Sequence, residues 1–312
     1  MAKISVALCT YNGEKFVHEQ IDSILNQTLK VDEIIICDDC STDKTQNILF
    51  EYQIKFPDIF KIYINEKNLR SVKNFEKTIS LCTGDFIFLS DQDDIWKDDK
   101  VEKISDYFEK NSSISVVATN GFIIDENSLK QDRYTVWDIP KFLGESKKKI
   151  DYFKIFATIG NLATGASMAI KKSFLNQVLP FPNINDLHHD EWIALVSAEQ
   201  KKFAFINEKL FSYRVHCNQQ VGGICYSKGE TYKEKITNRF DYEKEPHVFR
   251  DFKIKLRTLN DKEIKFKTYL ENDSNEHIKR FLKEVQKEKA VVEQKLKSQH
   301  FFLSLFFKYL YR

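Results

Sequence analysis

The alternation of short apolar runs with amphipathic segments is the feature that most constrains how this chain can fold. Runs rich in β-branched and aromatic residues lie at residues 4–9, 33–37, 61–65 and 85–89. Between them, apolar residues recur every three or four positions, as in helices that pack one face on a sheet. Strands that alternate with helices in this way form a largely parallel sheet with helices on both faces. The pattern therefore predicts an α/β fold whose ligands bind outside the carboxyl ends of the strands.

Polar residues directly follow three of the predicted strands. Thr10-Tyr11-Asn12 follows the first strand, Asp38-Asp39 the second, and Asp91 to Asp94 the fourth. Because the carboxyl ends of parallel strands lie at one edge of a sheet, we expect these segments to converge. No G-x-G-x-x-G follows the first strand and no G-x-x-x-x-G-K-S/T occurs in the chain. A dinucleotide oxidoreductase or a P-loop enzyme is therefore disfavoured.

The acidic segment after the fourth strand is a candidate metal site. In an extended chain Asp91 and Asp93 point to the same side. Two carboxylates this close repel each other unless a cation lies between them. Oxygen ligands suit Mg²⁺ or Mn²⁺, which share their coordination shell with water and substrate phosphates. The alternative is an acidic turn that caps a helix expected near Asp98 to Phe108.

Charge divides the chain into two regions. The 312 residues, 42% of them hydrophobic, are enough for one large α/β domain and an appendage. The net charge is only +2 and we expect no nucleic-acid partner, but residues 231–312 carry 20 Lys and Arg against 13 Asp and Glu. Apolar positions recur there at helical spacing. We predict an α/β domain over 1–228 and a basic helical extension over 229–312.

The six cysteines are Cys9, Cys37, Cys40, Cys82, Cys217 and Cys225. No export signal and no apolar stretch of transmembrane length are visible, so we expect reduced thiols and a cytoplasmic location. Cys37-Asp-Asp-Cys40 has the spacing of a redox or zinc pair, but two aspartates fill the gap. We therefore favour cysteines that pack at a strand end.

Several motifs occur together in the order found in one known family. They are Leu8-Cys9-Thr10-Tyr11-Asn12, Asp38-Asp39-Cys40-Ser41-Thr42-Asp43, Asn65 to Leu69, Thr83-Gly84-Asp85, Leu89 to Trp96, Gly165-Ala166-Ser167-Met168, His189-Asp190-Glu191-Trp192 and Tyr213 to Asn218. With this set, which covers residues 3 to 223, the chain resembles the inverting nucleotide-sugar glycosyltransferases of family 2. It is most similar to the rhamnosyltransferase-like members of bacterial surface-polysaccharide synthesis. The resemblance implies a GT-A fold, an acceptor-side strand at Gly165 to Met168 and a closing loop at Tyr213 to Asn218.

The resemblance also implies a UDP- or dTDP-sugar donor. The residues that it assigns to the nucleotide sugar are Thr10, Tyr11, Asn12, Glu14, Asp39, Arg70 and Asp91. Thr10 and Tyr11 would line the base pocket, and Asp39 would accept a hydrogen bond from the pyrimidine N3–H. Alternatively, Asp38 and Asp39 cap the helix that follows them.

Mg²⁺ or Mn²⁺ would be held by Asp93, with Asp91 and His216 as further ligands of the family's metal site. The cation would offset the charge that builds on the departing nucleoside diphosphate. A purely structural role in the closing loop is the alternative for His216. His188 and His189 could hold a second metal, but adjacent histidines diverge on a helix.

Asp190 is the candidate general base. It would deprotonate an acceptor hydroxyl as that oxygen attacks the anomeric carbon opposite the leaving group, which inverts the anomeric configuration with a single base. Glu191 follows directly but points about 100° away on a helix. The alternative is an acidic residue placed in the first turn to favour the helix dipole.

Two residues depart from the family pattern. Cys40 stands where relatives usually carry Gly, so the turn after Asp39 must tolerate a Cβ atom. Arg70 also stands where Gly is common, and its guanidinium could contact the donor diphosphate. This second departure weakens any assignment of the donor by analogy.

The aromatic tail at residues 301–312 is too short to span a bilayer. It could lie in the membrane interface beside the basic helices, on the inner face of the plasma membrane, where a lipid-linked glycan acceptor would be found. The alternatives are packing on the protein's own core and a homodimer interface. The absence of a transmembrane segment and of Q-x-x-R-W disfavours a processive synthase.

Two other functions remain open from the sequence. A sugar-phosphate nucleotidyltransferase of similar topology would release pyrophosphate instead of a nucleoside diphosphate. A non-catalytic glycan-assembly protein would keep its function after substitution of Asp93 or Asp190.

Overall fold

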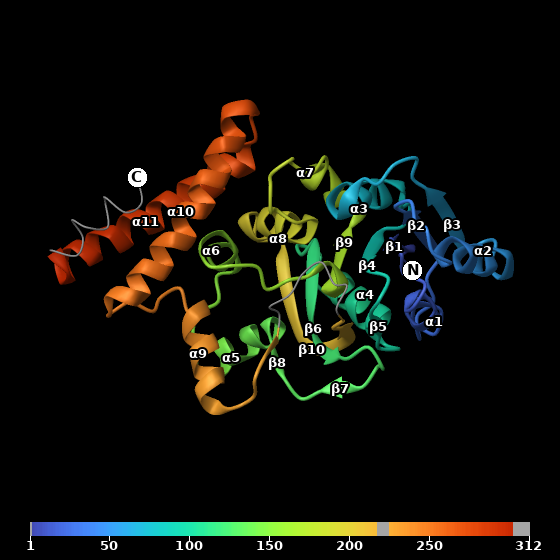
Figure 1. Cartoon of the computed structure of the whole chain (residues 1–312), viewed down its shortest axis with the longest axis horizontal. Coiled ribbons are helices and arrows are strands. Elements are labelled where there is room, and N and C mark those ends of the chain that lie inside the picture. The colour runs from blue at the N-terminus through green and yellow to red at the C-terminus, as the bar shows by residue number, and fades with distance from the viewer. Residues whose placement is uncertain (1, 217–224, 302–312) are drawn as a thin grey trace.

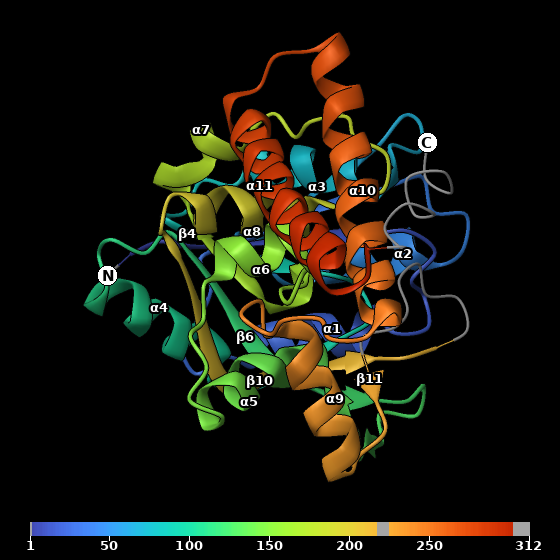
Figure 2. The same cartoon turned by 90° about the vertical axis from the view of Figure 1, so that its left-hand side faces the viewer.

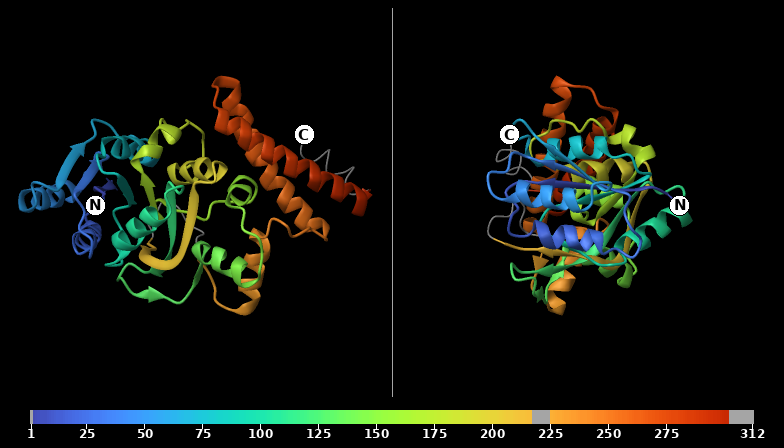
Figure 3. Two further views of the ribbon diagram at one scale, coloured as in Figure 1. Left: turned by 180° about the vertical axis from the view of Figure 1, so that it is seen from behind. Right: turned by 90° about the vertical axis from the view of Figure 1, so that its right-hand side faces the viewer.

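A mixed β-sheet with helices on both faces forms the centre of the computed structural model, which describes residues 2–216 and 225–301. The first strands and α2 (Thr45–Lys55) lie at one end of the long axis, and the helical hairpin of α10 (Phe249–Asn272) and α11 (Glu276–Gln299) lies at the other (Figure 1). The view from behind in Figure 3 shows β10 (Phe203–Arg214) curving across the middle of the molecule.

The first four strands form the parallel sheet that the sequence predicts, in the order β3-β2-β1-β4. They are β1 (Ile4–Thr10), β2 (Glu33–Asp38), β3 (Phe60–Ile64) and β4 (Phe86–Ser90), joined by α1 (Val17–Leu25), α2 (Thr45–Lys55) and α3 (Arg70–Leu81). β2 and β4 are buried along their whole length, because helices cover both faces of a parallel sheet. The alternating pattern of the sequence is therefore confirmed.

Beyond β4 the sheet continues with antiparallel pairings, and the direction of these strands was not predicted from the sequence. β9 (Met168–Lys171) runs antiparallel to both β4 and β6 (Val116–Ile124), and β10 (Phe203–Arg214) pairs in parallel with β6. β5 (Ile95–Trp96) closes the edge against β10. The predicted strand at Gly165 to Met168 was misplaced, since Gly165–Ser167 form a 3₁₀ turn and the strand starts at Met168.

The remaining elements are helices around this sheet, β7 (Lys130–Gln131), which pairs antiparallel with β6, and the two strands of a second small sheet. They are α4 (Lys100–Lys110), β7 (Lys130–Gln131), β8 (Tyr134–Thr135), α5 (Ile139–Glu145), α6 (Tyr152–Thr158), α7 (Leu175–Val178), α8 (His189–Glu199) and β11 (Cys225–Tyr226). The helix expected near Asp98 to Phe108 is α4, displaced by two residues. β8 and β11 pair with each other as a small separate sheet.

Three basic helices follow, as the charge and apolar spacing predict: α9 (Glu230–Phe240), α10 (Phe249–Asn272) and α11 (Glu276–Gln299). Figure 2 shows the α10–α11 hairpin lying over α6 and α8. The predicted apolar positions Phe252, Leu256 and Phe281 are buried in the same cluster as the sheet core. The extension thus shares its core with the α/β part, and the boundary after residue 228 stays a prediction.

Most of the aromatic tail, residues 302–312, lies outside the described residues, as do Cys217 and Asn218 of the predicted closing loop. No helix within residues 2–216 and 225–301 is both long and apolar enough to cross a membrane. The membrane and dimer interpretations of the tail therefore stay predictions.

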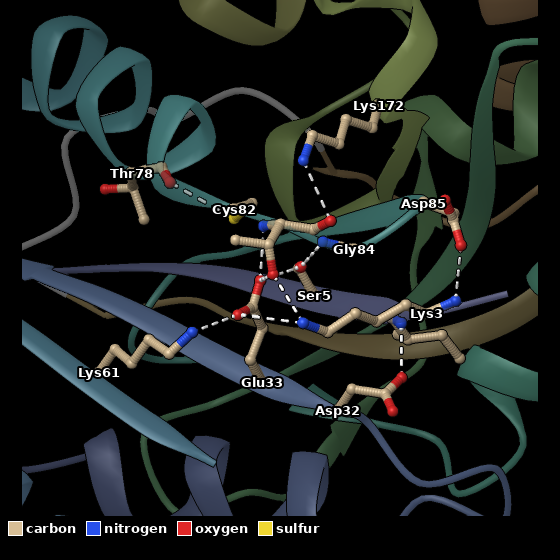
Figure 4. A network of polar contacts seen from close by, with 12 residues as sticks. Lys3, Ser5, Asp32, Glu33, Lys61, Thr78, Cys82, Gly84, Asp85 and Lys172 are labelled. Carbon is tan, nitrogen blue, oxygen red and sulfur yellow. Dashed lines mark hydrogen bonds and ion pairs between the residues drawn. The ribbon is translucent and has the colours of Figure 1, made fainter. Parts of the chain in front are cut away.

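A polar network fixes the amino ends of the central strands (Figure 4). The Glu33 carboxylate is buried and accepts hydrogen bonds from Lys61 Nζ at 2.7 Å, Ser5 Oγ at 2.6 Å and the Thr83 backbone N at 2.6 Å. Burial alone would raise the pKa of Glu33, but these donors outweigh it and lower the pKa to about 2. One carboxylate thus joins β1, β2, β3 and the turn before β4.

Gly84, in the predicted Thr83-Gly84-Asp85 motif, is required by the same close packing. A Cβ atom at this position would lie 2.6 Å from Ser5 Oγ and 2.8 Å from the Lys3 carbonyl oxygen. The Gly84 N–H donates to Ser5 Oγ at 2.7 Å. Only glycine lets the two strands approach to this distance.

We expect Glu33→Gln to lower the free energy of unfolding by about 2–4 kcal/mol, because it leaves a buried network with unmatched donors. The folded-state pKa lies below the ordinary value of 4.5, so the stabilisation by Glu33 is full above that pH and is lost as pH falls toward about 2. The difference in the free energy of urea unfolding between the variant and the wild type should therefore decrease as pH falls from 4.5 to about 2. Exposed Glu66→Gln is the control, and a pH-independent gap would contradict the assignment.

Candidate active site

A cleft of about 770 Å³ opens at the carboxyl ends of the strands, where the sequence predicts a ligand site. Residues between Cys9 and Phe240 line it, including Tyr11, Asp39, Asp91, Asp190 and Arg239. The three predicted polar segments therefore do converge, and the start of α8 faces them across the same cleft.

The carboxylates of Asp38 and Asp39 accept hydrogen bonds at the starts of different helices. Asp38 accepts hydrogen bonds from Thr10 Oγ1 and from the backbone N and Oγ of Ser41, which orders the turn before α2. Asp39 accepts from the backbone N atoms of Leu69 and Arg70, so it caps α3 and not the helix that follows it in sequence. Asp39 still lines the cleft, and its hydrogen bond with the pyrimidine of a nucleotide stays a prediction.

Tyr11 is 45% exposed at the mouth of the cleft, and its backbone is held by Gln92. Gln92 Oε1 accepts from Tyr11 N at 2.8 Å, and Gln92 Nε2 donates to Tyr11 O at 2.9 Å. A Cβ atom on Gly13 would lie 2.2 Å from Gln92 Oε1, so glycine makes room for this clamp. That Gln92 ties the acidic segment to the first loop was not predicted from the sequence pattern.

Asn12 and Glu14 hold the loops in place. Asn12 donates from its backbone N to Ser41 Oγ and accepts from Thr42 N through Oδ1. Glu14 lies outside the lining of the cleft, and its carboxylate accepts from Lys44 N at the start of α2. Their assignment to the nucleotide sugar remains a prediction.

Cys40 and Arg70, the two departures from the family pattern, both have left-handed backbones. Their φ angles are +66° and +63°, which explains why glycine is common at both places. The Cys40 thiol donates to the Asn65 carbonyl oxygen. The Arg70 side chain is exposed and lines the cleft, and its contact with a donor diphosphate stays a prediction.

The acidic turn contains three carboxylates in different environments. Asp93 Oδ2 lies 2.9 Å from His216 Nε2. Burial and the nearby charges of Asp93 and Asp190 raise the pKa of Asp91 to about 7. No group of three potential ligands gathers for a metal within the described ranges, so the predicted set of Asp93, Asp91 and His216 is not assembled as one cluster. Asp93 and His216 are the pair that the structure joins.

Two buried basic residues lie near this turn, and neither was assigned a role from the sequence. Arg214 Nε donates to the Asp93 carbonyl oxygen at 2.8 Å, and Arg214 N donates to Asp94 Oδ1 at 3.0 Å. Lys100 Nζ donates to the Ala166 carbonyl oxygen and lies 3.9 Å from the Trp96 ring centroid. Burial lowers the pKa of Lys100 to about 7, although Asp94 and Asp91 act in the opposite direction. Asp94 thus has a structural role, which the sequence had left undefined.

Asp190 stands in the first turn of α8. Its Oδ2 accepts from Gly165 N at 3.1 Å and its Oδ1 from Glu191 N at 2.6 Å. Desolvation in the cleft raises the pKa of Asp190 to about 6, against the opposing effects of His188 and the backbone donors. Glu191 turns toward Lys262 of α10, at 3.3 Å, as the helical spacing predicts. Asp190 is therefore a carboxylate whose pKa suits a base near neutral pH.

The other residues considered for chemistry have simpler positions. Trp96 and Trp192 are buried and pack in the core, as predicted. His188 is exposed and His189 is buried on Phe75, so the two histidines diverge. Cys9, Cys37, Cys40, Cys82 and Cys225 are all free thiols.

Residues 5–176 match the family Glycosyl transferase family 2. The chain belongs to this family. It is 31% identical over 252 residues to a dTDP-rhamnosyl transferase of Shigella flexneri, which covers 76% of this chain and 81% of the relative.

Solved structures of similar fold agree with the family. Staphylococcus aureus TarS in complex with UDP-GlcNAc superposes with a TM-score of 0.54 at 15% identity, covering 92% of this chain and 72% of that one. A mannosyltransferase from Pyrobaculum calidifontis in complex with GDP-Man and Mn²⁺ gives 0.52 at 14% identity, covering 95% and 75%. The family 2 glycosyltransferase has the predicted GT-A fold.

The left-handed turn at Cys40 supplies a test of the local strain. We expect Cys40→Gly to raise the free energy of unfolding by about 0.5–1 kcal/mol, since relief of the left-handed strain exceeds the extra chain entropy of glycine. Chemical denaturation would measure the change. Cys40→Ala is the matched control, because it removes the thiol but keeps the Cβ atom. Equal effects of the two substitutions would assign any change to the thiol.

Proposed function

We propose that this family 2 glycosyltransferase moves a hexose, such as rhamnose, from a UDP- or dTDP-sugar to a hydroxyl of a growing bacterial surface polysaccharide, with inversion of the anomeric centre. The observation that carries the proposal is the placement of Asp190 and of the Asp91–Asp93 turn in one cleft. The dTDP-rhamnosyl transferase relative supports the donor class. The similar structures hold UDP- and GDP-sugars, so the base remains part of the proposal.

In this mechanism Asp190 acts as the general base. Its carboxylate accepts the proton of the acceptor hydroxyl as that oxygen forms the new glycosidic bond, and the bond from the anomeric carbon to the diphosphate breaks on the opposite side. The hydrogen bonds from Gly165 N and Glu191 N orient the carboxylate. A single base and a direct displacement give inversion.

Mg²⁺ or Mn²⁺ fits the donor set of the acidic turn. Asp91 and Asp93 bring two carboxylates together whose repulsion contributes to the raised pKa of Asp91, and His216 Nε2 adds a ligand beside Asp93. Asp93 and His216 would hold the cation, with Asp91 nearby and the donor phosphates completing its shell. The cation would stabilise the negative charge on the departing nucleoside diphosphate.

The glycan acceptor would bind on the side formed by the C-terminal region. Tyr226, Arg239 and Phe240 line the cleft together with Asp190. Aromatic rings and an exposed cation are suited to a saccharide that carries an anionic group. A lipid-linked acceptor and peripheral contact with the inner face of the plasma membrane belong to the same proposal, with the basic helices facing anionic lipid.

Turnover tests the role of Asp190. We expect Asp190→Asn to lower kcat/KM by about 100- to 10,000-fold, measured as release of nucleoside diphosphate. In the wild type kcat/KM should fall as pH drops below about 6, because the protonated carboxyl cannot accept a proton. Glu191→Gln, the neighbouring carboxylate paired with Lys262, is the control and should keep most activity. Full activity of Asp190→Asn would reject the base assignment and favour a non-catalytic assembly protein.

Thermal shifts with nucleotide sugars test donor and metal together. A selective donor should raise Tm by several degrees with Mn²⁺ and by less without it, since ligands that bind the folded state stabilise it by mass action. Asp93→Ala should remove the Mn²⁺ dependence, whereas Asp98→Ala in the same segment should retain it. Release of pyrophosphate in place of a nucleoside diphosphate during turnover would instead indicate a nucleotidyltransferase.

A further inference from the structure

His189 is a buried imidazole that the mechanism above does not use. It is only 5% exposed, and neither ring nitrogen has a hydrogen-bond partner within residues 2–216 and 225–301. Buried polar atoms without hydrogen-bond partners cost free energy and are rare. A buried imidazole without partners in the wall of a cleft therefore indicates that a bound ligand supplies the missing hydrogen bond. His189 is one of the residues that line the cleft.

The ring is held in a fixed position beside Asp190. It stacks on the buried Phe75 ring with a centroid distance of 3.8 Å and an interplanar angle of 19°. Burial and the neighbouring His188 lower its pKa to about 3, so the imidazole is neutral at physiological pH. A neutral imidazole can donate from one nitrogen and accept at the other, as a sugar hydroxyl requires.

Glycine at position 165 leaves the edge of this ring uncovered by a side chain. A Cβ atom on Gly165 would lie 2.7 Å from His189 Nε2 and 3.7 Å from Asp91 Oδ2. The backbone N of the same residue donates to Asp190 Oδ2. His189 Nε2, Asp91 and Asp190 therefore surround one point next to Gly165.

That point corresponds to the place of the transferred sugar, an assignment that depends on the proposed function. In a direct displacement the sugar lies between the base and the diphosphate, here between Asp190 and the Asp91–Asp93 turn. We propose that His189 Nε2 forms a hydrogen bond with a hydroxyl of the donor sugar, and so recognises the sugar and not the nucleotide.

His189→Phe tests this because it keeps a ring to stack on Phe75 and removes both nitrogens. Calorimetry with Mn²⁺ would compare UDP with UDP-glucose and dTDP with dTDP-rhamnose, using the pair whose sugar form binds the wild type more tightly. We expect His189→Phe to weaken the sugar nucleotide about 3- to 10-fold, the loss of one hydrogen bond, and to leave the nucleoside diphosphate unchanged. Equal losses for both ligands, or none, would overturn the proposal.

Gly165→Ala tests the same point sterically, because its Cβ atom would occupy space assigned to the sugar and would lie 2.7 Å from His189 Nε2. It should weaken binding of the sugar nucleotide in the same selective way, whereas Gly144→Ala, whose Cβ atom would meet no atom within 4 Å, should bind both ligands as the wild type does.

In the wild type, the ¹⁵N signal of one neutral histidine should shift when the sugar nucleotide binds and not when the nucleoside diphosphate alone binds. No such shift would contradict the contact even where a variant fails to fold.

The outcomes separate this inference from the proposed function. If the wild type binds none of these nucleotide sugars and turns none over, the proposed function fails. If the wild type transfers sugar while His189→Phe keeps the preference for the sugar form, only the role of His189 fails. A His189→Phe effect confined to the KM of the acceptor would also overturn the proposed role of His189, because that result would place the imidazole on the acceptor side.

Discussion

The geometry of the site depends on the buried guanidinium of Arg214. It binds the Asp93 carbonyl oxygen from the end of β10 and forms an ion pair with Glu19 of α1 at 3.1 Å, while the Arg214 backbone N donates to Asp94. A turn with three carboxylates would otherwise be pushed apart by their mutual repulsion. Arg214 Nε holds the backbone of Asp93 through its carbonyl oxygen, and the Asp93 carboxylate lines the cleft beside His216.

The amino and carboxyl ends of the central strands differ in how their backbone is stabilised. At the amino ends, Glu33 joins three strands and Gly84 lets them approach closely, so the sheet there is fixed by short buried hydrogen bonds. At the carboxyl ends the loops contain left-handed residues such as Asn12, Cys40 and Arg70. Strained backbone persists only where the surrounding structure determines it strongly. The rigid amino ends and the apolar core supply that support to the loops that line the cleft.

The sequence predicts best what depends on local periodicity. The four parallel strands and the helical C-terminal region follow from apolar spacing, which reports burial directly. The helix carrying Asp190 and the strand near Met168 came from the family resemblance. The antiparallel direction of β9 was not predicted because strand direction depends on distant partners. Lys100 and Arg214 were missed because a lysine or arginine in a sequence gives no sign of whether its charge is buried. His189 was considered only as a metal ligand, and its lack of partners is visible only in three dimensions.

The C-terminal helices share a hydrophobic core with the elements that line the cleft. Lys262 of α10 pairs with Glu191 and also donates to the Phe156 carbonyl oxygen, so it ties the first turn of α8 to α6. The same turn holds His189 and Asp190, the residues proposed to contact the sugar and to act as the base. Since α9 supplies Arg239 and Phe240 to the cleft wall, this extension bounds the side of the cleft where the acceptor is proposed to bind. Under the proposed function, variation in these helices would change acceptor choice without altering the parallel strands that precede the proposed donor loops.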